Sequence, residues 1–184
     1  MDPNEIDALL DSAKLPEATV QLCLRPDLRE QWEKLDNELK DVQSAHVTMG
    51  GVGPREKELA KQIKDIEAQI AKHTLEVRLR GLAHDPWATL VASYPPRPDF
   101  RDDQAVGLNL TDFLRALIAK EIVEPELSRE QLEKLLGKIT DAQYNDLANA
   151  AWQLGRADRS GPVFSQAASR VIPDSDETSR PLSA

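Results

Sequence analysis

The sequence has one cysteine, few aromatic residues and no long apolar run, and each of these absences excludes a class of protein. The single Cys23 cannot form an internal disulfide and has no second cysteine with which to share a metal ion. Aromatic residues make up only 4% of the chain, which disfavours a β-sandwich. No apolar stretch approaches the roughly 18 residues that could span a bilayer. A membrane is therefore not an expected partner.

Basic residues are also too few and too scattered for a nucleic-acid binder. The 184-residue chain has 23 lysines and arginines against 32 aspartates and glutamates, which gives a formal net charge of -9. Because the basic residues alternate with acidic ones, they form no cluster that could neutralise phosphates. The N-terminal sequence MDPNEIDALL is acidic and lacks the basic and hydrophobic regions of a signal peptide. We therefore expect a protein that works in the cytoplasm where it is made, without nucleic acid as a partner.

Catalytic motifs are missing as well. The chain contains no G-x-x-x-x-G-K, G-x-G-x-x-G or G-x-S-x-G motif. Its three histidines, His46, His73 and His84, do not have the spacing of a zinc site. Asp102 and Asp103 lie in a predicted loop, where adjacent acids normally serve solubility rather than catalysis. We predict that the protein is not an enzyme and has no catalytic residue, metal site or cofactor.

Two segments of heptad-spaced apolar residues flank the glycine-rich sequence GGVG. This pattern predicts an antiparallel coiled-coil hairpin. An alternating segment lies at each end of the hairpin, TVQLCL at 19–24 and TLEVRLR at 74–80, and predicts a half-buried strand. A two-stranded ribbon is marginal in water, so we expect it to lie on the C-terminal helices. The heptad residues are Leu28, Trp32, Leu35, Leu39 and Val42, then Leu59, Ile63, Ile66 and Ile70.

After Gly81 the pattern predicts four short helices. Asp85 is expected to cap the first of them, and the sequence from Tyr94 to Gly107 to form a loop. Capping boxes of the form S/T-x-x-Q begin at Ser128 and Thr140, and Gly155 is a predicted C-cap. Three aromatic residues on helical faces are expected in the core: Trp87, Phe113 and Trp152.

The predicted fold is therefore mainly α, with an antiparallel coiled-coil hairpin on a two-stranded antiparallel β ribbon, followed by a small bundle of about four short helices. The tail contains one apolar stretch, PVFSQAASRVI, which can dock on a partner as a linear segment or pack on the protein's own bundle. The expected divisions are a flexible leader (1–17), strand–hairpin–strand (18–80), helical bundle (81–155) and a mostly disordered tail (156–184). The candidate partner-binding residues in the tail are Val163, Phe164, Val171 and Ile172.

Several segments, taken in order, resemble the tail assembly chaperones of long-tailed phages and prophages of actinobacteria. No single segment is diagnostic, and the resemblance rests on their order over about residues 15–175. The segments are CLRPDL (23–28), VRLRGL (77–82), DPWATLVASYPPR (85–97), VGLNLTDFLRALI (106–118), VEPELSREQLEKLL (123–136), LANAAWQLGR (147–156) and FSQAASRVI (164–172).

The resemblance implies a non-enzymatic assembly factor of the host cytoplasm that is absent from the mature virion. Such a protein binds the tape measure protein and keeps it soluble until the tail tube protein polymerises around it. The tail, the coiled-coil hairpin or a groove of the helical bundle could receive the partner. The alternative is a structural phage component, such as a head–tail connector or minor tail protein. The sequence leaves self-association open.

Overall fold

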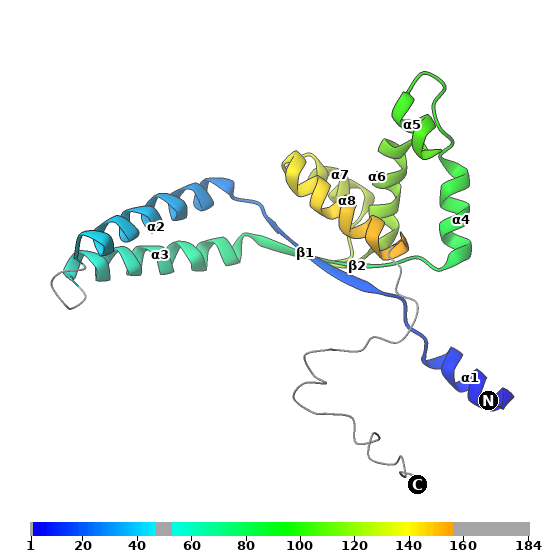
Figure 1. Ribbon diagram of the computed structural model, residues 1–184, viewed down its shortest axis with the longest axis horizontal. Helices are drawn as coiled ribbons and strands as arrows, with labels where there is room; N and C mark the ends of the chain where they lie inside the picture. Colours follow the sequence, from blue (N-terminus) through cyan, green and yellow to red (C-terminus); the bar gives the residue numbers. More distant parts are fainter. Residues whose placement is uncertain (1, 47–52, 157–184) are drawn as a thin grey trace, which may run out of the picture.

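The computed structural model describes residues 2–46 and 53–156, and Figure 1 shows an elongated molecule. A pair of long helices extends from one end of a small sheet, shorter helices pack on the sheet, and an N-terminal helix lies beyond the other end. The elements are α1 (Pro3–Ser12), β1 (Glu17–Cys23), α2 (Pro26–His46), α3 (Pro54–Lys72), β2 (Thr74–Arg80), α4 (His84–Ser93), α5 (Arg101–Val106), α6 (Leu110–Glu121), β3 (Ile122–Glu124), α7 (Arg129–Leu136) and α8 (Asp141–Arg156).

The sheet has three antiparallel strands in the order β1-β2-β3. β1 and β2 pair along their whole length, from Glu17 opposite Arg80 to Cys23 opposite Thr74. β3 adds a short third strand, which places Glu124 opposite Arg78, and the register between β2 and β3 shifts at this point. The predicted fold class, a coiled-coil hairpin on a two-stranded ribbon, is therefore wrong about the sheet, although the chain is mainly helical.

β3 was not predicted because it is only three residues long, which is too short to show an alternation of apolar and polar residues. In the structure α6 ends at Glu121, and the chain turns at once into an extended conformation along β2. The third strand joins the sheet directly to the helical body.

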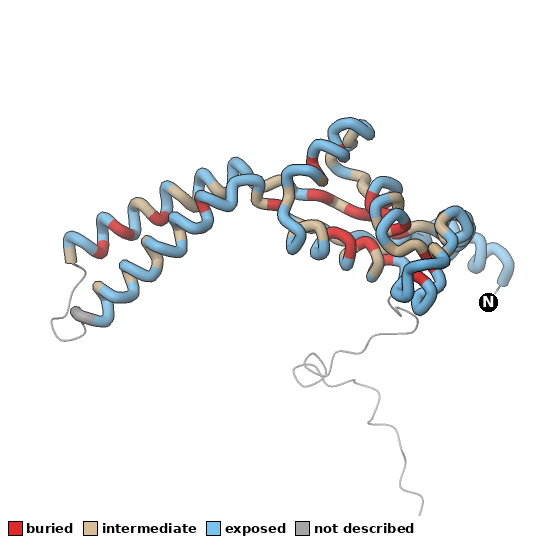
Figure 2. Tube along the Cα trace, turned by 90° about the horizontal axis from the view of Figure 1, so that it is seen from above, coloured by how far each residue is buried: buried red, intermediate tan, exposed pale blue. Residues whose placement is uncertain are grey.

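The α2–α3 pair also differs from the predicted coiled coil. The two helices lie side by side (Figure 2), but their seam is only partly closed. Of the nine predicted heptad residues, Leu28, Leu59 and Ile63 are buried, while the others remain half-buried. A continuous buried seam is what stabilises a coiled coil. We therefore describe α2 and α3 as a helix pair with an open seam.

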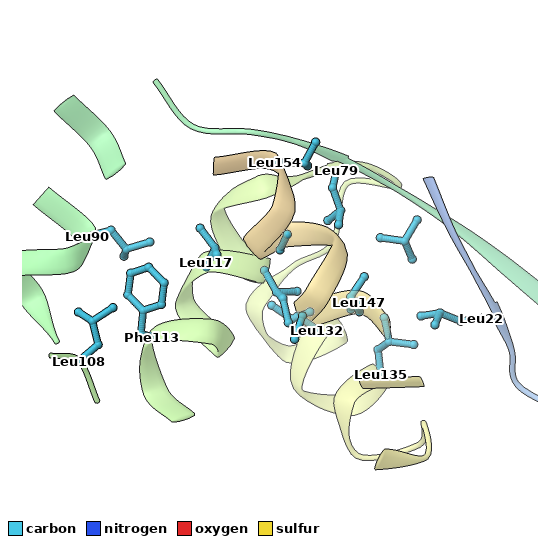
Figure 3. Packing of buried hydrophobic residues seen from close by; sticks show 14 residues of the cluster. Leu22, Leu79, Leu90, Leu108, Phe113, Leu117, Leu132, Leu135, Leu147 and Leu154 are labelled. Carbon is cyan, nitrogen blue, oxygen red and sulfur yellow. The ribbon is translucent and has the colours of Figure 1, made fainter. Parts of the chain in front are cut away.

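The main core lies between the sheet and the helices, not inside the helix pair. Leu22, Val77 and Leu79 of the sheet pack with residues of α6 and α8 in one cluster (Figure 3). Phe113 of α6 is fully buried, and its ring meets those of Trp87 and Trp152 edge to face, at 5.6 and 6.0 Å between centroids. The prediction that Trp87, Phe113 and Trp152 belong to the core is confirmed.

Helix ends show where local sequence signals hold and where packing overrides them. The capping boxes at Ser128 and Thr140 are both present. The hydroxyl oxygen of each cap residue accepts a hydrogen bond from the backbone N–H of the glutamine three residues later, and the side-chain oxygen of that glutamine accepts one from the backbone N–H of the cap residue. Asp85 is not a cap, because α4 begins at His84 with Ala83 before it. Gly155 is not a C-cap either, because it lies inside α8. Five helices, not four, follow β2 in the described part of the chain.

Gly155 is required by its contact with Trp87. A Cβ atom at this position would lie 2.3 to 2.8 Å from three carbons of the indole ring, well inside van der Waals distance. We expect Gly155→Ala to lower the free energy of unfolding by about 2 kcal/mol, because the aromatic cluster must shift to admit the methyl group. Urea unfolding monitored by tryptophan fluorescence would measure this loss.

Gly137→Ala is the matched control, because a Cβ there meets nothing closer than 3.4 Å and the backbone φ is -78°. Equal stability of the two variants would contradict the packing account of Gly155.

Candidate protein-binding surfaces

The predicted partner-binding residues of the tail lie outside the described residues, so the structure does not place them. These residues are Val163, Phe164, Val171 and Ile172. The binding surfaces that the structure does offer lie on the helical body, at the base of the helix pair and on α1.

A groove between α6 and α7 is one of these surfaces, with a volume of about 540 Å³. Its lining includes the half-buried Ala116 and the exposed Ala119 of α6, whose small side chains leave room for another backbone to approach. Leu127 and Leu132 supply apolar walls. Tyr94 lies at one end, where its ring contacts Phe113 edge to face at 6.3 Å. We call this surface the α6–α7 groove.

Charged residues of both signs border the α6–α7 groove. Arg115 of α6 and Glu133 of α7 form an ion pair across it, and Asp112 and Arg129 lie along its margins. An apolar lining between charged margins is typical of grooves that bind the apolar face of an amphipathic helix. The margins can pair with charges on either side of such a helix.

The loop that positions Tyr94 is closed by an ion pair between the partly exposed Arg97 and the buried Asp103. Arg97 donates from Nε and Nη2 to the two carboxylate oxygens of Asp103, at 2.6 and 3.1 Å, and its backbone N–H donates to the same group. The Arg97 guanidinium holds the pKa of Asp103 below its ordinary value. Asp103 is nearly fully buried, so the expectation of a solvated loop acid is wrong. Part of the predicted loop is helical, since α5 spans Arg101–Val106.

Sequence analysis missed Asp103 because its partner, Arg97, lies six residues away in an irregular segment where no periodicity links the two. The backbone N–H of Asn109 also donates to the carbonyl oxygen of Tyr94, at 3.0 Å, and joins the two ends of the loop. The loop is therefore a closed unit that fixes one end of the α6–α7 groove.

We expect Asp103→Asn to destabilise the protein by about 2 kcal/mol, because it leaves the Arg97 guanidinium without its carboxylate partner. The wild-type contribution should be complete above the ordinary pKa of an aspartate, about 3.9, and should disappear as pH falls through the lowered pKa of folded Asp103. Denaturant unfolding between pH 2 and 7 would test this dependence.

The neighbouring substitution Asp102→Asn is the control, since Asp102 is exposed. If both substitutions had the same effect, the Arg97–Asp103 pair would not be the cause.

A second surface is a pocket of about 530 Å³ at the base of the helix pair. Its lining combines Trp32 of α2 with Ile70 and Ala71 of α3 and with polar residues of β1 and β2. Trp32 Nε1 donates to Glu67 at 3.3 Å, and Lys64 Nζ lies 2.6 Å from the other oxygen of that carboxylate. These two donors lower the pKa of Glu67. The pocket opens beside the half-buried heptad residues.

The third surface is the apolar face of α1. Ile6, Leu9 and Leu10 are 44, 55 and 66% exposed, and no residue of α1 is buried. The helix is closed at its start by a capping box between Asp2 and Glu5. This ten-residue helix lies inside the segment 1–17 that was expected to be a flexible leader.

A buried carboxyl group lies at the end of α6. Glu121 is fully buried, and neither of its side-chain oxygens has a hydrogen-bond partner among the described residues. Burial raises the pKa of Glu121 to about 8; the backbone of Leu82 acts in the opposite direction but makes no hydrogen bond of good geometry with it. The side chain is thus neutral at pH 7. Glu121 lies three and four residues after the core residues Ile118 and Leu117, a spacing that could have revealed it.

We expect Glu121→Gln to stabilise the protein at pH 8 by about 2 kcal/mol and to have little effect near pH 4.5. An unfolded glutamate ionises above its ordinary pKa of 4.5, while the folded one stays protonated to about pH 8. Wild-type stability should therefore fall as pH rises between these values, and glutamine should remove that slope. Unfolding free energies across this range would measure it. The exposed Glu126→Gln should keep the wild-type slope, and an unchanged slope in Glu121→Gln would refute the assignment.

Within the described residues, no group of three or more metal-ligating side chains comes together. No helix in that part of the chain combines the length and apolar character needed to cross a bilayer.

No protein-family model, curated protein or solved structure matches the chain. A function can therefore be proposed only from the geometry of the binding surfaces and from the order of the sequence segments that resemble tail assembly chaperones.

Proposed function

We propose that the protein is a tail assembly chaperone that binds the tape measure protein and keeps it soluble while the tail tube protein assembles. The observation that carries this proposal is the α6–α7 groove, whose alanine and leucine lining and charged margins suit a helix of a long helical partner. The ordered sequence segments that resemble tail assembly chaperones support the same function. We further propose that it acts in the host cytoplasm and leaves before the virion matures.

The charge of the chain fits the work of a protein that holds an aggregation-prone partner. Burial of apolar surface supplies affinity in such complexes. A net charge of -9 keeps chaperone molecules apart from one another and would keep a bound partner in solution. Phe100 and Val106 are exposed apolar residues of the 94–107 segment and add to the apolar area available to a partner.

We expect co-expression with the tape measure protein of the same genome to increase its soluble fraction severalfold. Ala119→Arg should abolish the increase, because Ala119 lines the groove and a long charged side chain there would obstruct it. Ala60→Arg makes the same change at an exposed position of α3 and should leave the effect intact. Solubility in lysates and affinity capture of the complex would measure both variants.

Two results would argue against this function. If Ala119→Arg supported solubility as well as the wild type, the α6–α7 groove would not be the binding site. If mass spectrometry found the chain in stoichiometric amounts in purified virions, the protein would instead be a structural phage component.

A further inference from the structure

Among the described residues, the outer edge of β1 has no strand beside it. β1 is the outer strand of the sheet, with β2 on one side only. Leu24 N–H donates to the His73 carbonyl and Gly81 N–H donates to the Pro16 carbonyl, so even-numbered positions of this segment direct their backbone groups toward β2. In an antiparallel ladder the alternate residues direct theirs away. The outward N–H and C=O groups therefore belong to Glu17, Thr19, Gln21 and Cys23.

These outward groups are almost all unpaired. Among the described residues, the one contact to them is from Gln143 Nε2, which donates to the Cys23 carbonyl at 2.8 Å. β1 contains no lysine or proline, and its pairing with β2 has no bulge, so it lacks the devices that normally protect an edge strand. The opposite edge is protected, because β3 has three residues and Pro125 follows it without an N–H. Among the described residues, β1 therefore offers the longest strand edge that is open to another strand.

We propose that the β1 edge pairs with β1 of a second copy of this chain, antiparallel and about a two-fold axis at Val20. This register pairs all seven residues of the strand. It places Glu17 opposite Cys23 of the second copy, and Thr19 opposite Gln21 of the second copy. No two like charges face each other, so the edge is complementary to itself. Each pair of outward residues can exchange two backbone hydrogen bonds.

Two exposed leucines at the ends of the strand support a second copy as the occupant. Leu15 and Leu24 are 43 and 40% exposed and lie just before and just after β1. Under the proposed two-fold axis, position 24 of one copy falls opposite position 16 of the other, so Leu24 packs beside Pro16 and lies one residue from Leu15 in the second chain. This contact occurs twice per dimer and covers the apolar side chain of Leu24, which the single chain leaves in water.

The same axis also accounts for α1. Antiparallel pairing brings the segment before β1 of one copy beside the segment after β1 of the other, and so places α1 next to α2 of the second copy. In Figure 1, α1 lies beyond the end of β1 and away from the helical body. A ten-residue helix is marginal without packing, and Ile6, Leu9 and Leu10 give it an apolar face for that purpose. Its acidic residues disfavour pairing of α1 with α1.

Sedimentation velocity of the full chain is expected to show a species of twice the chain mass at micromolar concentration. Thr19→Lys with Gln21→Lys places lysine opposite lysine and should weaken dimerisation about 100-fold. Thr19→Glu with Gln21→Glu should do the same. Both positions are exposed in the single chain, so folding is preserved. Mixing the two double variants should restore the dimer, because lysines then face glutamates.

Cysteine cross-linking would test the register. Glu17→Cys should give a disulfide-linked dimer through Cys23 of the second copy, because Cα atoms of such a pair lie about 5.5 Å apart. Thr19→Cys is the matched control and should not link, since it lies two residues from the position opposite Cys23.

The proposal would be overturned if the chain stayed monomeric up to about 100 μM, which is far above the range of a specific dimer. It would also be overturned if the dimer persisted in both double variants, or if Glu17→Cys and Thr19→Cys cross-linked equally. A chain that dimerises only after residues 157–184 are removed would also overturn it, because the edge would then be covered by the chain's own tail. These measurements do not involve the tape measure protein, so they stand apart from the proposed function.

Discussion

The structure depends on the burial of one face of the three-stranded sheet against α6 and α8. Leu22, Val77 and Leu79 point into that contact, and without it the strands would have no reason to remain together in water. Everything else is attached to this unit. The helix pair extends from the strand ends, and the 94–107 loop closes over α6. The opposite face of the sheet carries ion pairs instead, such as Glu17 with Arg80 and Glu124 with Arg78.

Sequence analysis reached the elements that have long, regular patterns. The alternation of Val20 with Leu22 and of Val77 with Leu79 was enough to locate both main strands, and capping chemistry located the starts of α7 and α8. It could not reach β3, since three residues carry no period. It also overestimated the helix pair, because heptad spacing specifies which residues face each other but not how closely the two helices approach.

The errors at the candidate sites have a different cause. Asp103 and Glu121 are buried acids; Asp103 was expected to be a solvated loop residue, and no burial was predicted for Glu121. What decides their environment is tertiary: one meets an arginine across an irregular loop, and the other lies at the core end of α6. Gly155 shows the same effect, since its role follows from the Trp87 ring and not from the end of a helix. Local rules failed where distant parts of the chain meet.

The two proposals combine through the symmetry of the sheet. A two-fold axis that relates antiparallel neighbours is perpendicular to the sheet, so the proposed dimer has six strands in one sheet and the helices of both copies on the same face. Both α6–α7 grooves then belong to one assembly, while the helix pairs extend in opposite directions. A long helical partner that engaged both grooves would gain affinity from the second contact without any new chemistry. One open strand edge and one shallow groove would each bind a partner weakly, whereas the dimer pairs the two edges and places two grooves in one assembly.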